Sequence, residues 1–481
     1  MKRLVLATVA FVGVALSPGA QAPVAPDAQA IAEHVRQALA RDRVPGAAVA
    51  VIWRGEVVLL QGFGTDGVGR PVTPHTGFRL GSMSKAFTAL AVMRAVEANQ
   101  LSLDAPVQSV LPDFALTDPQ AAARITLRQL MAHTSGLPRT APRTAPRAAP
   151  EAPLADHVAA LAKAEPAAEP GERHIYSSPN YLVAARMLEV ATGTPFADVL
   201  SDTVFGPLGL SDTLVTAADD RGGRFAPGHR YLFGFPLVAS LPEEPGRLAT
   251  AGVISTAADM ARFLRFQLGD GAWEDGRLLG PALMAEMQRG TTEGDGFRYA
   301  MGWRESRIGA FRALHHGGIL PDFRGKMVLL PELGNAVVVL TNASTLMPLP
   351  AAPTSHRLAD EIARNLVGEP LRSSTFGFGT AVLAVWSGLV LLLAAQLRAL
   401  VRPRPRKRWP WVRAVCDLGA ALALTLLPPL AFGLSWQDLW LGAPDLVIWS
   451  ALMIALVGAQ CVRGARRTVA LQEAEQKSVS R

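Results

Sequence analysis

The chain is nearly free of cysteine, with only Cys416 and Cys461 among 481 residues. Two cysteines cannot make the disulfide framework of a small secreted domain. Charged residues are also sparse, at 18%, whereas apolar residues reach 49% and the mean hydropathy is +0.22. This composition excludes a disordered chain and leaves room for a large core together with further apolar segments.

Acidic and basic residues nearly cancel over most of the chain. The net charge of +7 and the pI of about 9.8 would suggest nucleic acid or anionic lipid as a partner. Residues 371–481, however, hold 13 basic against 5 acidic residues, a net charge of +8, whereas residues 1–370 hold 34 against 35, a net charge of −1. The basic excess belongs to the last quarter, where membrane topology accounts for it, so we expect no nucleic-acid partner.

The N-terminus has the three regions of a secretory signal peptide. Lys2 and Arg3 precede an apolar run over residues 4–16, and the small residues Ala20 and Ala22 follow a Pro-Gly break. We therefore predict a signal peptide over residues 1–22 and cleavage after Ala22. The alternative is an uncleaved anchor, but an apolar run of 13 residues is shorter than the roughly 20 that span a bilayer.

Three apolar stretches near the C-terminus have the length of membrane-spanning helices: residues 376–397, 412–434 and 443–462. The alternative is that they are buried helices of a soluble domain. That alternative is strongest for the second stretch, because it contains Asp417 and a Pro428-Pro429 pair. We expect three transmembrane helices, and hence membrane lipid as a partner.

The loops between these stretches differ sharply in charge. The second connection carries Asp438 and Asp445 and no basic residue, whereas the first is strongly basic. Basic loops stay in the cytoplasm, so the first connection and the tail at residues 463–481 are predicted to be cytoplasmic. Residues 23–370 would then lie outside the cytoplasm, in the periplasm or the extracellular space, on a multi-pass protein of the cell membrane. The basic residues of the first connection are Arg398, Arg402, Arg404, Arg406, Lys407 and Arg408.

The exported part shows strand patterns at both ends and helical patterns between them. Strands are expected at residues 46–53, 56–63, 311–316, 323–330 and 335–341, and the first two are joined by an Arg54-Gly55 turn. Helices are expected at residues 85–97, 180–192, 257–267 and 354–367. This order predicts an α/β (α+β) domain, whose sheet is completed by its C-terminal part and which carries an inserted helical region.

Residues 139–170 form a segment of low complexity. Thr-Ala-Pro-Arg occurs twice in succession and is followed by an Ala- and Pro-rich tract. Such a composition favours a flexible surface insertion. A lid over a substrate site is the alternative, because the segment lies next to the motifs described below.

Ser82 and Lys85 form a candidate nucleophile and base. A spacing of three puts both side chains on one face of the helix that begins there. A serine needs a base, and an amine in a partly desolvated site can serve as one. The chain has 41 arginines and 6 lysines, so a lysine at this position suggests a group that has to give up its proton.

Two further motifs contain groups that can transfer protons. Tyr176, one of four tyrosines, precedes a helix, and it could act as a base near a lysine or simply cap that helix. His315-His316-Gly317-Gly318 lies between two expected strands, where glycines allow a substrate to approach the backbone closely. A histidine pair is more often structural, and we find no further ligands at a spacing that would indicate a metal site.

Together these segments resemble the serine β-lactamase and penicillin-binding-protein superfamily, specifically its class C-like branch of β-lactamases, D-aminopeptidases, carboxypeptidases and esterases. The resemblance covers residues 27–367. It implies a β-lactamase-like antiparallel sheet flanked by helices, with no metal and no organic cofactor. The segments that resemble the family are residues 80–85, 101–114, 130–138, 176–189, 252–263 and 316–323.

The resemblance also implies a role for each site residue. Ser82 would be the acylated nucleophile, Lys85 its activating base and Tyr176 a second proton-transfer group. The backbone N–H groups of Ser82 and Ile319 would form the oxyanion hole. The segment 133–136 resembles a structural signature of the family. The residues implied to contact the substrate are Ser178, His316, Gly317, Gly318 and Ile319.

Two departures from the family pattern bear on the substrate. Ser178 stands where many β-lactamases have an asparagine that bonds the substrate amide, and His316 stands where penicillin-recognising enzymes usually have a lysine. Both favour an esterase or D-peptidase over an efficient β-lactamase. We therefore expect a membrane-tethered serine hydrolase that forms an acyl-enzyme with an ester, a peptide or a cell-wall fragment. The alternative is a sensor that is acylated without turnover and signals through its membrane helices.

Overall fold

The computed structural model describes residues 25–139, 152–239, 245–274, 276–346, 351–372, 377–401 and 436–479, together with residues 415 and 419. The predicted signal peptide, the Thr-Ala-Pro-Arg repeat and most of the second apolar stretch lie outside these residues.

An eight-stranded antiparallel sheet forms the centre of the domain, in the order β2-β1-β14-β13-β12-β11-β10-β9. The N-terminal hairpin joins the C-terminal strands because β1 pairs with β14, with Ala47 opposite Thr341. The predicted antiparallel sheet, completed by the C-terminal part, is thereby confirmed. The strands are β1 (Gly46–Trp53), β2 (Glu56–Gly64), β9 (Thr292–Gly294), β10 (Phe297–Tyr299), β11 (Arg304–Ile308), β12 (Phe311–Ile319), β13 (Arg324–Leu330) and β14 (Asn335–Thr341).

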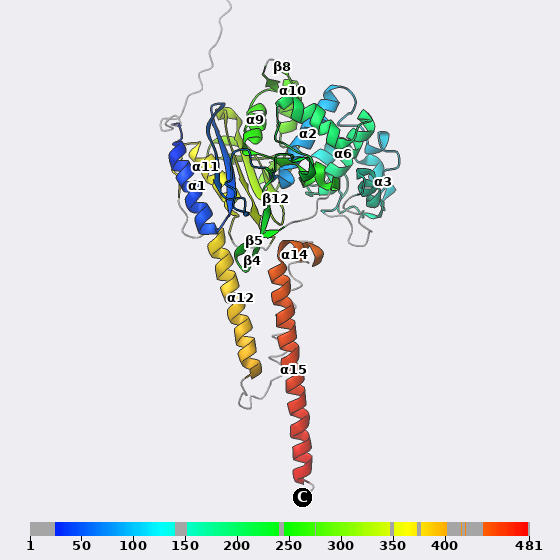
Figure 1. The fold of residues 1–481 in the computed structure, drawn as a ribbon. Coiled ribbons are helices and arrows are strands. Elements are labelled where there is room, and N and C mark those ends of the chain that lie inside the picture. Colours follow the sequence, from blue (N-terminus) through cyan, green and yellow to red (C-terminus); the bar gives the residue numbers. More distant parts are fainter. Residues whose placement is uncertain are drawn as a thin grey trace, which may run out of the picture.

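Helices cover both faces of this sheet, so its central strands are apolar on both sides. Successive residues of β1 alternate between two hydrophobic clusters: Ala48 and Ala50 belong to one, and Val49 and Val51 to the other. The first cluster contains α2 (Ser84–Glu97) and α9 (Ala257–Leu268), and the second contains α1 (Ala28–Asp42) and α11 (Thr354–Asn365). Figure 1 shows α1 and α11 on one side of the sheet and α2 and α9 on the other.

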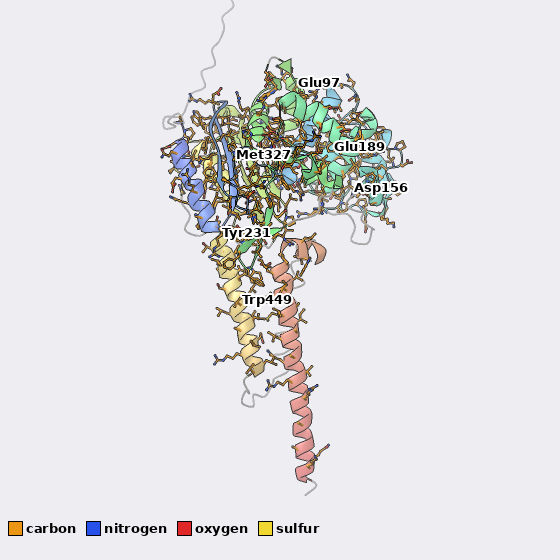
Figure 2. All side chains as sticks on the ribbon, in the orientation of Figure 1. Glu97, Asp156, Glu189, Tyr231, Met327 and Trp449 are labelled. Atoms are coloured by element: carbon orange, nitrogen blue, oxygen red, sulfur yellow. The ribbon has the colours of Figure 1, made fainter. Side chains whose placement is uncertain are left out.

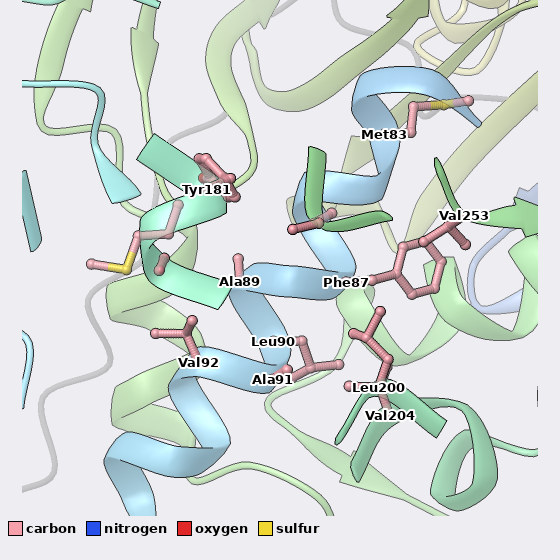
Figure 3. Close-up of a cluster of buried hydrophobic side chains, with 14 of the residues drawn as sticks. Met83, Phe87, Ala89, Leu90, Ala91, Val92, Tyr181, Leu200, Val204 and Val253 are labelled. Atoms are coloured by element: carbon pink, nitrogen blue, oxygen red, sulfur yellow. The ribbon is translucent and has the colours of Figure 1, made fainter. Parts of the chain in front are cut away.

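The inserted region is helical, as expected, and it is organised around α2. Figure 3 shows side chains of α2 in contact with Tyr181 of α6, and with Leu200, Val204 and Val253 from the segments that follow. Nearly every residue of α2 is buried, so the helix cannot shift without disrupting the core. The other helices of this region are α3 (Pro119–Arg124), α4 (Leu127–Met131), α5 (Leu154–Ala159), α6 (Ser178–Thr192), α7 (Phe196–Leu200), α8 (Gly206–Leu208) and α10 (Pro281–Gln288).

Three small sheets accompany the central one. The largest has the order β15-β4-β5 and lies beside the C-terminal helices (Figure 1). Its β4–β5 hairpin was not expected from the sequence. The strands of these sheets are β3 (Phe78–Arg79), β4 (Gly228–Leu232), β5 (Phe235–Ala239), β6 (Ile254–Ser255), β7 (Ala272–Trp273), β8 (Gly276–Arg277) and β15 (Ala343–Ser344).

The C-terminal part contains α12 (Phe378–Val401), α14 (Trp436–Gly442) and α15 (Pro444–Val479). Among the described residues, one segment, Phe378–Arg398, is long and apolar enough to cross a membrane, and the apolar part of α15, Pro444–Gln460, is shorter. Three transmembrane helices are therefore not confirmed. The predicted tail, from residue 463, is helical through Val479 and continues α15.

Helices α12 and α15 run in the same direction away from the domain. Trp449 Nε1 donates to the carbonyl of Leu389 (3.0 Å). Further toward the C-terminal end of both helices, Gln460 Nε2 donates to the carbonyl of Gln396 (2.9 Å). Both helices begin at the domain (Figure 1). Val401 thus lies at the far end of α12, whereas Trp436, the first residue of α14, lies near the domain.

Candidate active site

Ser82 and Lys85 lie at the start of the buried helix. A 3₁₀ turn, Gly81–Met83, leads directly into α2 and places the Lys85 side chain inside the protein, where it is 0% exposed. Lys85 Nζ lies 3.4 Å from Ser82 Oγ and donates to the carbonyl of Thr250 at 2.9 Å. Thr250 belongs to a helical turn, Leu248–Gly252, that packs against α2. The predicted nucleophile and base are thus brought together.

Tyr176 is the third group at this point. Lys85 Nζ lies 5.1 Å from the centre of the Tyr176 ring. The tyrosine hydroxyl is buried and has no hydrogen-bond partner among the described residues. A buried hydroxyl without a partner is unusual, and a substrate group would satisfy it. Ser178, the other residue predicted on this motif, is half-buried at the first position of α6.

Strand β12 lies directly against the turn that carries Ser82. A Cβ atom on Gly318 would lie 1.9 Å from the carbonyl oxygen of Leu80, so only glycine permits this approach. Gly81 has a φ of +55°, and a Cβ atom there would lie 2.9 Å from the backbone nitrogen of Ile319. The backbone N–H groups predicted for the oxyanion hole, those of Ser82 and Ile319, therefore come from adjacent segments.

The His315–His316 pair is divided between the two faces of β12. Alternation along the strand puts His316 on the same face as Gly318, toward Ser82, and puts Gly317 on the face of α11, where a Cβ atom would meet the ring of His356. Among the described residues, no three His, Cys, Asp or Glu side chains come together as metal ligands would.

His316 is held as a neutral ring with a defined tautomer. Its Nδ1 lies 2.8 Å from the carbonyl of Gly317, which can only accept, so Nδ1 carries the proton. Nε2 therefore accepts from the Tyr299 hydroxyl, at 3.2 Å. Burial, followed by the charges of Arg304 and Lys85, lowers the pKa of His316 well below its usual value. Burial raises the pKa of Tyr299 well above its usual value, so this donor keeps its proton.

His133 supports the segment that carries Tyr176. Its Nδ1 accepts from the backbone N–H of Ser177 (3.2 Å) and from Asn180 Nδ2 (2.9 Å), and its ring lies 4.5 Å from that of Tyr176. The backbone of His133 has a φ of +58°, a conformation that is uncommon outside glycine. Burial and the charge of Lys85 lower its pKa well below the usual value, so the ring is neutral.

Arg304 adds a positive charge that the sequence motifs did not reveal. It lies on β11, opposite His315, and its guanidinium carbon is 5.5 Å from the centre of the Tyr176 ring. Its Nε is buried without a hydrogen-bond partner among the described residues. It is one of 41 arginines, and its place beside Tyr176 depends on the register of the sheet. Tyr299 and Thr250 were missed for the same reason, because each comes from a segment without a motif of its own.

Comparisons with known proteins identify the family. Penicillin-binding protein 4 from Amycolatopsis lactamdurans is 35% identical over 253 residues, which are 51% of this chain and 65% of that protein. The unguisins hydrolase ungD' from Aspergillus campestris is 28% identical over 334 residues, covering 66% of this chain and 62% of that protein. The chain thus spans less than two thirds of the length of these relatives.

A solved structure shows the same fold. The octameric penicillin-binding protein homologue from Pyrococcus abyssi matches with a TM-score of 0.61 and 23% identity, over 71% of this chain and 78% of that one. The family model described as Beta-lactamase matches residues 31–361, more than half of the 481 residues. The sheet, the buried Ser82–Lys85 turn and this match agree, and the chain belongs to the beta-lactamase family.

Proposed function

We propose that the protein is a membrane-tethered serine hydrolase of the cell exterior or periplasm, and that it works through an acyl-enzyme on Ser82. The observation that carries the proposal is the fully buried Lys85 amine, 3.4 Å from Ser82 Oγ. A lysine used only for solubility would lie at the surface. The relatives named as a penicillin-binding protein and a hydrolase support the same class of chemistry.

In the first half of the reaction, Ser82 Oγ attacks the substrate carbonyl and its proton passes to Lys85 Nζ. The carbonyl of Thr250 holds the amine in place through a 2.9 Å hydrogen bond. The negative charge that develops on the carbonyl oxygen is stabilised by the backbone N–H groups of Ser82 and Ile319. When the C–O or C–N bond breaks, Tyr176, whose hydroxyl has no other partner, is placed to deliver a proton to the leaving group.

In the second half, water attacks the acyl carbon and Ser82 is released. Tyr176 and Lys85 act in the opposite sense, taking a proton from the water and returning one to Ser82 Oγ. The product is a carboxylic acid. Because the rings of His133 and His316 are neutral, the positive charges beside Tyr176 are Arg304 and, once it has taken the proton of Ser82, Lys85.

The substrate classes that fit are an ester, a D-amino-acid peptide such as a cell-wall fragment, or a β-lactam-type amide. Ser178 offers fewer hydrogen bonds to a substrate amide than an asparagine would. His316 offers its ring edge to Tyr299 and carries no charge, so it cannot pair with a substrate carboxylate. These two features favour an ester or a small peptide over an efficient β-lactamase reaction.

The C-terminal helices would hold the domain at the outer face of the cell membrane. Segment Phe378–Arg398 has the length and apolarity of a membrane span. The shared direction of α12 and α15 is compatible with a three-pass arrangement in which the apolar stretch 412–434 would be the second span. With the basic connection in the cytoplasm, the domain would lie outside, and the signal peptide would deliver it there.

A fluorophosphonate probe tests the nucleophile. We expect the probe to label the wild-type chain on Ser82 and to leave Ser82→Ala unlabelled, whereas Ser84→Ala, two residues away, keeps most of its labelling. Labelling of Ser82→Ala at the wild-type rate would refute the proposal. Multiple turnovers of a p-nitrophenyl ester separate a hydrolase from a sensor, because a sensor would stop after one equivalent of product.

A further inference from the structure

The β4–β5 hairpin exposes a group of large apolar side chains at the edge of the domain where α12 and α15 begin (Figure 1). Isolated apolar side chains on a surface are ordinary, whereas a contiguous group marks an interaction site. We call this group the hairpin patch, and it is apolar at nearly every exposed position. Its residues, with their exposed fractions, are Phe233 (37%), Phe235 (57%), Leu237 (50%) and Val238 (52%).

The hairpin packs along the first turns of α12. The ring of Tyr231 lies 5.6 Å from that of Phe378, and the ring of Phe233, at the tip, lies 4.7 Å from that of Trp386. A Cβ atom on Gly234 would lie within about 3.3 Å of Val382 and Leu383. At a rise of about 1.5 Å per residue, these contacts place the tip roughly 6–12 Å beyond the start of α12. Figure 2 shows Tyr231 where α12 leaves the domain.

The length of the apolar segment decides where the hairpin lies relative to a bilayer. The 21 residues of Phe378–Arg398 make a helix of roughly 30 Å, which matches the hydrocarbon core. If the bilayer began below the hairpin tip, only residues 387–397 would remain, and these reach about 16 Å, too short to cross. Helix α12 can therefore span the membrane only if its first turns, and the hairpin beside them, enter the outer leaflet.

The joint between the domain and the helices is fixed by hydrogen bonds at three points. The buried carboxylate of Asp42 accepts from the backbone N–H of Gly379 (3.2 Å), in the first turn of α12. The backbone N–H of Phe233 donates to Asp445 Oδ2 (3.0 Å), at the start of α15, and Thr345 Oγ1 donates to the carbonyl of Gly442 (3.2 Å). The depth of the hairpin is thus set by that of the helices.

The turn of the hairpin also contains an unusual residue. Phe233 and Gly234 form a two-residue turn with φ values of +51° and +85°. Asparagine or aspartate ordinarily occupies the first of these positions, and a bulky residue with positive φ is strained. A strained phenylalanine at the tip is retained where its side chain has a use, here against Trp386 and beside the exposed patch.

We propose that the hairpin patch inserts into the outer leaflet of the lipid bilayer, at the boundary between headgroups and acyl chains. The proposal rests on the membrane span proposed above. Aromatic and aliphatic side chains suit this boundary, and Trp440 of α14, 52% exposed at the same end of the domain, has the chemistry of an interfacial anchor. The guanidinium of Arg43, 5.0 Å from the centre of the Phe235 ring, is then placed at the level of the lipid phosphates.

The test uses the full chain in phosphatidylcholine proteoliposomes. Replacing Cys416 and Cys461 by serine gives a cysteine-free background. Single variants Val238→Cys, Leu391→Cys and Val190→Cys then carry an NBD fluorophore. Val190 is an exposed valine of α6 (43%) and is the matched control for Val238, whereas Leu391, 70% exposed on α12, reports on the span itself. Fluorophosphonate labelling of each variant shows that the domain is folded.

We expect lipids with a doxyl group near the headgroup to quench NBD at Val238 several-fold more strongly than at Val190, and lipids with a mid-chain doxyl group to quench NBD at Leu391. Quenching at Leu391 with none at Val238 would overturn the hairpin inference and leave the span intact. A fluorophore at Val238 that is shielded from both lipid doxyl and aqueous iodide would mean that protein covers the patch, which also overturns the inference. Absence of quenching at Leu391 would refute the span, and the inference with it.

Discussion

The active site and the membrane-side joint both bury polar groups, but the proton-transfer groups of the site and the central carboxylate of the joint differ in how fully they are paired. At the site, the Tyr176 hydroxyl, His133 Nε2 and Arg304 Nε are buried without hydrogen-bond partners among the described residues. At the joint, the Asp42 carboxylate accepts from four groups, which are Arg41, Thr354, Arg357 and the backbone of Gly379. Unpaired groups leave free energy available for a substrate, whereas a saturated carboxylate fixes the parts that it joins. The contrast predicts which substitutions reduce activity and which reduce stability.

The largest expected effect is on activity. Lys85→Gln keeps a donor to the carbonyl of Thr250 but cannot take the proton of Ser82, so we expect the rate of ester hydrolysis to fall by about 10³-fold. The melting temperature should change little by comparison. Lys163→Gln, which alters an exposed lysine, is the matched control and should keep full activity. If Lys85→Gln kept wild-type kcat, Lys85 would be a structural residue and the contrast between the regions would fail.

The next effect is on stability. Asp42→Ala leaves the half-buried Arg357 guanidinium without one of its carboxylate partners and removes the cap of α12, so we expect a loss of about 3–5 kcal/mol in the free energy of unfolding. Urea unfolding in detergent micelles measures this loss. Asp27→Ala, at the other end of α1, removes an exposed helix cap and should cost only about 1 kcal/mol.

The activity of the Asp42→Ala variant separates a joint from a site. Because Asp42 contacts α11 and α12 and no group of the site, the kcat of the folded fraction should equal that of the wild type. A fall in kcat that is as large as the one in Lys85→Gln would show that the two regions are one functional unit.

A smaller effect on activity is expected from Tyr299, which donates a hydrogen bond to His316. Tyr299→Phe removes the donor to His316 Nε2 and leaves that buried nitrogen without a partner, so the ring is held less firmly and we expect kcat/KM to fall about tenfold, the equivalent of about 1.4 kcal/mol. Tyr181→Phe is the matched control. Its hydroxyl is equally buried, but it donates to the carbonyl of Met131, so its loss should lower stability and spare kcat/KM. Equal kcat/KM losses in both variants would mean that Tyr299 has only a packing role.

The local parts of the site could be predicted from the sequence, and the parts assembled by the sheet could not. Ser82 and Lys85 are three residues apart on a helix, so their contact follows from helix geometry. The Arg54-Gly55 turn was predicted because it separates two clear strand patterns that are adjacent in the sequence. Arg304, by contrast, reaches Tyr176 through the pairing of β11 with β12, and no spacing in the sequence encodes that distance.

The fold shows the same division. Strands β1, β13 and β14 were predicted almost to the residue, because each has five or more consecutive residues of suitable pattern. Strands β9 and β10 have three residues each, too few to show a period. The β4–β5 hairpin was missed because its turn is Phe-Gly rather than Asn-Gly and its exposed face is apolar. The Phe-Gly turn and the exposed apolar face, which hid this hairpin in the sequence, are also the features on which the proposed lipid contact rests.

The last effect, which is confined to acidic pH, concerns a residue that links the two regions. His356 lies on α11, two residues after Thr354, which bonds to Asp42, and its ring packs on Gly317 of the site strand. Burial, followed by the charges of Arg324 and Lys326, lowers its pKa to about 3. A depressed pKa means that the unfolded chain, with a histidine pKa of about 6.5, binds the proton first. Stability is therefore complete above about pH 6.5 and falls as the pH drops toward the folded value.

His356→Gln keeps a donor for the carbonyl of Gly325. We expect this variant to lack the pH-dependent contribution of His356 to stability. Between about pH 7 and pH 5 the variant should lose about 2 kcal/mol less unfolding free energy than the wild type. Urea unfolding at the two pH values, in detergent micelles, measures the difference, and ester hydrolysis at pH 7 should be unchanged. Parallel stability profiles would mean that the pKa of His356 is the same in the folded and the unfolded chain. A change in activity at pH 7 would instead show that the packing of α11 on Gly317 supports the site strand, and α11 would then belong to both regions.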